Sequence, residues 1–126
     1  MMPGSRPPVR TALVLDADRD TLGLLREWLG DAGWSVLAAA QRDERPVQLI
    51  LIDLAYPRRG EASAPLQAVA AAHPRTPVLA LSATFHANIE PHGEVARQLR
   101  VAGVLPKPIR REALLAAVHH ATAPPR

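Results

Sequence analysis

Four polar side chains stand at the ends of apolar runs, and their types together suit phosphoryl transfer. They are Asp16 after TALVL, Asp53 within LILIDLA, Ser82 at the end of PVLALS and Lys107 after VLP. A carboxylate that interrupts an apolar run needs a cation partner, because an unpaired buried charge is costly. Two carboxylates, a hydroxyl and an ammonium would supply an acceptor, ligands for a divalent cation and donors to phosphoryl oxygens.

The elements that position these residues alternate along the chain. The predicted strands span 11–15, 34–38, 49–54, 77–82 and 104–106, and the predicted helices span 22–32, 64–72, 94–102 and 111–121. Alternating strands and helices imply parallel pairing through right-handed crossovers. We therefore predict an α/β fold, a flavodoxin-like three-layer sandwich with a five-stranded parallel sheet in the order 2-1-3-4-5 and helices on both faces. Strands one and three are then neighbours, so their carboxylates converge.

One crossover is too short for a complete helix. The link AAQRDERPVQ (39–48) is polar and contains Pro46, and we expect its helix, the second of the fold, to be shortened or missing. The first helix has better signals. Asp18 and Asp20 are candidates for its N-cap, and Gly33 is suited to the position after its C-cap.

The composition predicts one small intracellular domain. The 126 residues include no cysteine and no run long enough to span a membrane. We expect tails at 1–9 and 122–126 around a domain at 10–121. Although the net charge is +3, the basic residues are scattered arginines apart from Lys107, and aromatic residues are few. We therefore expect no nucleic acid and no membrane among its partners.

Four motifs resemble those of response regulator receiver domains, the CheY-like superfamily. They occur in the family's order: LVLDAD, LILIDLAYP, PVLALSA and AGVLPKPI. The resemblance implies a bacterial, cytoplasmic domain of a two-component system. Its acceptor, Asp53, would take a phosphoryl group from a histidine kinase or a phosphotransfer protein. Such a domain is a signalling module, and its only chemistry is its own phosphorylation and dephosphorylation.

The same resemblance implies the groups that hold the phosphoryl oxygens. Lys107, the hydroxyl of Ser82 and the amide of Ala83 stand at the positions that do so in the family. Pro108, which follows the lysine, is expected to have a cis peptide bond. These roles place the ends of the strands at 77–82 and 104–106 beside Asp53.

The metal site that the resemblance implies departs from the family's pattern. Asp16, Asp53 and the backbone carbonyl of Ala55 match ligands of Mg²⁺, but Ala17 replaces the second residue of the usual acidic pair. Mg²⁺ often binds through one or two carboxylates and keeps several waters, so Asp16 and Asp53 can still hold it. We expect this binding to be weak, because Ala17 supplies no ligand. Asp18 would join the site only if its loop were remodelled.

A second departure concerns output. Family members carry an aromatic switch residue at the position of Val104, and they contact their targets through the helix at 94–102, the strand at 104–106 and the helix at 111–121. Valine has no ring to move, so the usual coupling to the Ser82 hydroxyl is missing. The resemblance does not identify the downstream protein, and it allows a homodimer.

The loop TFHANIEPHG carries His86 and His92, which we expect to be exposed and to bind no metal.

These departures favour an alternative, a pseudo-receiver that binds proteins without being phosphorylated. A calcium loop is a further interpretation, because Asp16, Asp18, Asp20 and Glu27 occupy positions one, three, five and twelve of such a loop. However, Thr21 stands where the loop needs glycine, and the helical pattern starts inside the run.

The last alternative is a haloacid-dehalogenase-type phosphatase. In that class the first aspartate of a DxD motif is the nucleophile and the second is the acid, which would assign these roles to Asp16 and Asp18. Asp20 replaces the threonine or valine that the class has, and no acidic pair follows Lys107. The receiver interpretation, with Asp53 as acceptor, accounts for more of the motifs.

Overall fold

The sheet sets the positions of the candidate residues. The computed structural model describes residues 10–38, 46–54 and 63–123, and gives only the backbone of 63–65. Its strands are β1 (Arg10–Leu15), β2 (Trp34–Ala38), β3 (Leu49–Asp53), β4 (Val78–Ser82) and β5 (Gly103–Pro106). All neighbouring pairs are parallel, in the order β2-β1-β3-β4-β5. The predicted topology is confirmed.

The register of the strands brings the candidate residues to one edge of the sheet. Asp53 ends β3 opposite Leu81 of β4, and Ser82 ends β4 opposite Pro106 of β5. Beyond the last strand residues, the amide of Lys107 donates to the carbonyl of Ser82 at 3.0 Å. The carboxyl ends of the three strands are therefore nearly level, which is where ligands bind in parallel α/β sheets.

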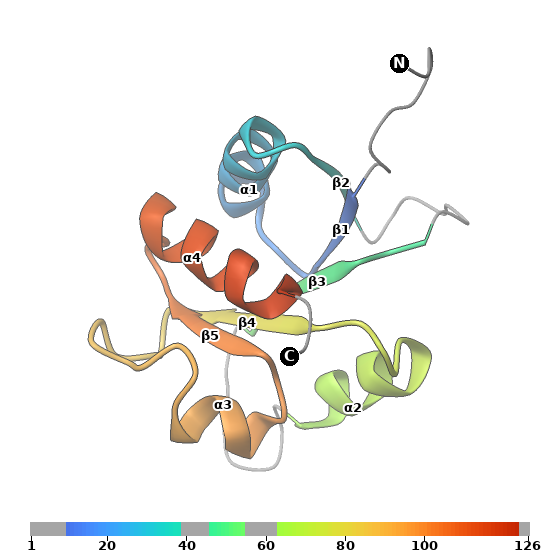
Figure 1. Cartoon of the computed structure of the whole chain (residues 1–126). Helices are drawn as coiled ribbons and strands as arrows, with labels where there is room; N and C mark the ends of the chain where they lie inside the picture. Colours follow the sequence, from blue (N-terminus) through green and yellow to red (C-terminus); the bar gives the residue numbers. More distant parts are fainter. Residues whose placement is uncertain (1–9, 39–45, 55–62, 124–126) are drawn as a thin grey trace.

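Two layers of helices cover the sheet, as Figure 1 shows. The helices are α1 (Arg19–Asp31), α2 (Ser63–Ala72), α3 (Glu94–Leu99) and α4 (Arg111–Thr122). Leu25 of α1 and Leu114 of α4 belong to one buried cluster, whereas Leu66 of α2 and Ala96 of α3 belong to the other. Neighbouring residues of each central strand alternate between the two clusters, as expected for a sheet that is buried on both faces.

The ends of α1 follow the sequence signals. The side chain of Asp18 caps the helix by accepting from the amide of Thr21 at 3.2 Å. At the other end, Gly33 has a φ of 93°, a conformation that glycine adopts without strain. Both residues were expected at these positions.

The remaining expectations concern links and tails. No helix forms over 46–48, the described part of the link between β2 and β3, and 39–45 lie outside the described residues. The expected tail 1–9 also lies outside them, as do 124–126. Helix α4 continues to Thr122, one residue past the expected end of the domain. None of the described helices is both long and apolar enough to cross a membrane.

Candidate functional site

The ammonium of Lys107 joins two carboxylates at the carboxyl edge of the sheet. Its Nζ donates to Oδ2 of Asp53 at 2.7 Å and to Oδ1 of Asp18 at 3.0 Å. The Asp53 side chain is 8% exposed, that of Lys107 is 23% exposed and that of Asp18 is 54% exposed. The nearly buried Asp53 thus has the cation partner that its place in an apolar run requires.

Asp18 has two roles in this arrangement. While it caps α1, its Oδ1 also accepts from the Thr21 hydroxyl at 2.5 Å and from Lys107. The hydrogen bond from the Thr21 hydroxyl, then those from Lys107 and from the Thr21 amide, hold the pKa of Asp18 far below its usual 3.8. All these donors stabilise the charged form of the carboxyl group. The sequence predicted the cap, but not the contact with Lys107.

The two carboxylates also affect Lys107. Burial lowers its pKa, but the hydrogen bonds to Asp53 and Asp18 outweigh this effect and leave the pKa above the usual 10.5. Lys107 is therefore charged at neutral pH and places a fixed positive charge against Asp53. The peptide bond between Lys107 and Pro108 is cis.

Ser82 is fully buried and lies at the end of β4, beside β3. Its Oγ lies 2.8 Å from Oγ1 of Thr84 and accepts from the amide of Thr84 at 3.1 Å. In this structure the hydroxyl therefore bonds to its own loop. Ala83 lies between the two residues and is exposed.

The expected metal ligands are only partly among the described residues. Asp16 is exposed, has a φ of 59°, and makes no side-chain hydrogen bond or ion pair with another described residue. Ala17 is half-buried and packs against the α1–α4 core. The expected carbonyl ligand, that of Ala55, lies outside the described residues. Within the described ranges, no three carboxylate, histidine or cysteine side chains gather closely enough to hold a metal ion.

Val104, at the switch position, is completely buried in the α2–α3 core. It pairs with Ala80 of β4, and its amide donates to the carbonyl of Pro91 at 2.9 Å. Its side chain therefore belongs to the packed core, where an aromatic ring would need more space.

The two loop histidines behave differently. Both His86 and His92 are exposed, as expected. However, the ring of His92 stacks on that of His120 in α4, with 3.7 Å between the ring centroids, and its Nδ1 lies 2.9 Å from the carbonyl oxygen of Ala102. Gly103 leaves room for this ring, because a Cβ there would lie 3.3 Å from His92. No pattern in the sequence predicts this contact.

Comparison with known proteins shows what this fold resembles. No protein-family model matches the sequence, and a search of curated proteins gives no match. Solved structures do match. A response regulator from Thermotoga maritima is 20% identical over 93% of this chain and 100% of its own, with a TM-score of 0.70. The chemotaxis response regulator CheY4 of Vibrio cholerae is 21% identical over 90% and 99%, with a TM-score of 0.68. The signal receiver domain of an HD domain-containing protein from Pseudomonas fluorescens is 19% identical over 90% and 94%, with a TM-score of 0.67.

Proposed function

We propose, because this chain has the fold of response regulator receiver domains, that it accepts a phosphoryl group on Asp53 and signals through protein contacts. The donor would be the phosphohistidine of a histidine kinase or a phosphotransfer protein. The observation that carries this proposal is the 2.7 Å bond between Lys107 and Asp53 at the carboxyl edge of the sheet. It pairs a nearly buried nucleophile with a fixed cation, as phosphoryl transfer requires.

The attack would start from Asp53. Lys107 binds Oδ2 of Asp53, and no described residue donates to Oδ1. Oδ1 is therefore the attacking atom in our proposal. The bond from Oδ1 to phosphorus forms as the bond from phosphorus to the imidazole nitrogen breaks, and the electron pair of the broken bond stays on that nitrogen. Lys107 stays close enough to stabilise the negative charge on the phosphoryl oxygens. Ser82 would leave Thr84 to donate to one of these oxygens.

The described residues do not fit Mg²⁺ well. Asp16 and Asp53 are the carboxylates proposed for it, but Lys107 already binds Asp53, and Asp18 is engaged by both Lys107 and Thr21. We therefore assign no step to the metal and propose that it binds weakly.

Replacing Ala17 with aspartate tests this account of the metal. We expect Ala17→Asp to tighten Mg²⁺ binding about tenfold or more, because it adds a carboxylate beside Asp16. The measurement is an Mg²⁺ titration followed by backbone NMR. Equal affinities in the two proteins would refute the idea that Ala17 limits binding.

Beryllium fluoride, a mimic of the aspartyl phosphate, tests phosphoryl acceptance. With Mg²⁺ present, we expect shifts of backbone NMR signals centred on Asp53, Ser82 and Lys107. The control is Asp53→Asn, which should lose the whole response because the amide cannot bind the mimic. An unchanged spectrum of the unmodified chain at millimolar Mg²⁺ would overturn phosphorylation as its function.

That negative result would instead favour the second candidate, a phosphorylation-independent pseudo-receiver. Two observations favour this candidate: Ala17 provides no ligand, and the hydroxyl of Ser82 is bonded to Thr84. In either case we propose a cytoplasmic signalling protein whose downstream protein binds the face made by α3, β5 and α4. The stacked rings of His92 and His120 join the loop before α3 to α4 on this side of the molecule.

A further inference from the structure

A hollow at the amino ends of the strands is separate from the Asp53 site. It has a volume of about 480 Å³, and its walls include Arg10 at the start of β1, Gln48 before β3, and Arg75 and Pro77 before β4. The amino ends lie on the right of Figure 1, whereas Asp53 ends β3 and Lys107 comes directly after β5, at the opposite ends of their strands. The volume lies within the range of small-molecule sites, which is roughly 300–1,000 Å³.

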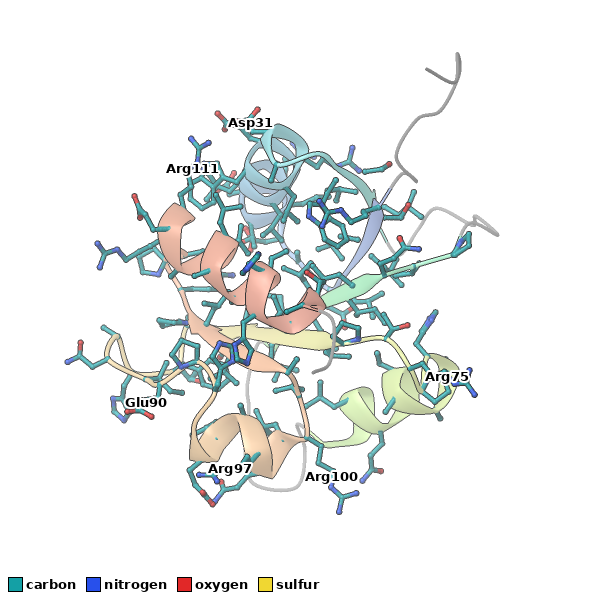
Figure 2. All side chains as sticks on the ribbon, viewed as in Figure 1. Asp31, Arg75, Glu90, Arg97, Arg100 and Arg111 are labelled. Carbon is teal, nitrogen blue, oxygen red and sulfur yellow. The ribbon has the colours of Figure 1, made fainter. Side chains whose placement is uncertain are left out.

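The two charged residues among the described walls of this hollow are Arg10 and Arg75. Neither forms an ion pair with a carboxylate of the described residues. Figure 2 labels Arg75, which lies between α2 and β4. Gln48 accepts from the amide of Thr11 at 2.7 Å through its carbonyl oxygen, so its amide group remains as a further donor.

The walls around these donors are fixed by their own contacts. The guanidinium of Arg10 lies 5.1 Å from the ring centroid of Trp34, which is nearly buried. The hydroxyl of Thr122, another wall residue, already donates to the carbonyl of Val118 at 2.7 Å. This hydrogen bond holds the Thr122 side chain in place in the absence of a ligand. A smaller hollow of about 230 Å³ shares Arg10, Trp34 and Thr122 and adds His119.

We propose that this hollow binds a small organic anion through a carboxylate or phosphate group. Arg10 and Arg75 donate to the anionic oxygens, because guanidinium groups match the geometry of both anions. Pro77 and Val47 provide apolar surface for the rest of the ligand. The hollow is separate from the phosphoryl acceptor: the ligand would bind at the amino ends of the strands, whereas phosphoryl transfer would take place at their carboxyl ends.

The test is an NMR titration of the full chain with inorganic phosphate and, separately, with citrate, at constant ionic strength. We expect saturable shifts at the amides of residues 10, 34, 48 and 75–76. A response to phosphate alone identifies phosphorylated ligands, and a response to citrate alone identifies carboxylates. The proposal is overturned if neither anion gives saturable shifts or if chloride gives the same shifts.

Matched variants show whether the two arginines are responsible. Arg75→Gln and Arg10→Gln should each weaken binding about fivefold or more, since each removes a charged donor. Arg26→Gln on α1 removes the same charge outside the hollow and should leave the affinity within about twofold. Arg10→Gln also removes the contact with Trp34, so Arg75→Gln is the decisive variant. Unchanged affinity in Arg75→Gln would overturn the site.

Discussion

At the scale of single residues, Asp18 is the least expected member of the site. One carboxylate caps α1 and also binds the lysine that holds the proposed acceptor. Ala17 has no carboxylate, whereas Asp18, the N-cap residue of α1, binds Lys107. The start of α1 is thereby tied to the end of β5 by charge.

The ion pairs of Lys107 give a stability that depends on pH. The pKa of Asp18 is lowered on folding, so its contribution is complete above 3.8 and is lost as the pH falls below that value. The pKa of Lys107 is raised, so its contribution is complete below 10.5 and is lost as the pH rises through the folded value. We therefore expect the free energy of unfolding from this cluster to be constant between these limits.

Asp18→Asn is the variant that tests this cluster. Asparagine keeps the N-cap but removes the charge, so the pKa of Lys107 should fall and the acid-side loss of stability should shrink. Urea unfolding across the pH range and the NMR titration of the Lys107 Nζ signal measure the two effects. Thr21→Val removes one donor to Asp18 and leaves the charge, so it should keep most of the raised pKa of Lys107. An identical titration of Lys107 in Asp18→Asn would contradict the ion pair.

The residue types of the site could be read from the sequence, but their contacts could not. Asp53 and Lys107 were predicted together because they lie at the carboxyl ends of two buried strands of one parallel sheet. The contact between Lys107 and Asp18 joins residues 89 positions apart. It depends on how closely the first turn of α1 approaches β5, and no local pattern records that distance.

At the scale of elements, the periodicity of apolar residues predicted which side chains are buried in the core. In α1 the fully buried residues Leu25 and Leu29 recur four positions apart, as in an amphipathic helix. The strands were predicted equally well, because each is a short apolar run between turns. The contact of His92 with His120 could not be predicted, because it depends on a loop conformation and on the space left by Gly103.

Two adjacent leucines of α1 test this account of the helix. Leu25 is completely buried, whereas Leu24 is 38% exposed. Leu25→Ala should lower the free energy of unfolding by about 2–5 kcal/mol, because it removes buried apolar contacts and leaves a cavity. Leu24→Ala should lower it by less than about 1 kcal/mol. Chemical denaturation of both variants gives these values, and similar losses would show that α1 does not pack as described.

At the scale of the whole molecule, the two hydrophobic clusters lie on opposite faces of one sheet, and the same central strands contribute side chains to both. Figure 2 shows Arg111 of α4 near Asp31 of α1, but these side chains are exposed and their charged atoms are 3.8 Å apart. Such a surface pair contributes little. The α1–α4 layer is therefore held to the sheet by apolar packing, and the α2–α3 layer packs against the opposite side of the same strands.

This sharing predicts that both layers unfold together. Trp28 and Trp34 belong to the α1–α4 side, so their fluorescence reports on that layer, while far-ultraviolet circular dichroism reports on all the helices. Ile52→Ala lies on the α2–α3 side, yet it should shift the midpoints of both signals equally. A fluorescence midpoint that stays at its original value would show that the two layers are independent.

Lys107 also gives the protein a chemical property that follows from its composition. It is the only lysine, so Lys107, between Asp18 and Asp53, is the one side-chain amine that acylating reagents can modify. Only a neutral amine reacts, and both carboxylates favour the charged form. The rate at which Lys107 is acylated therefore measures how firmly the two carboxylates hold it. Any label attached there would lie directly against the proposed acceptor.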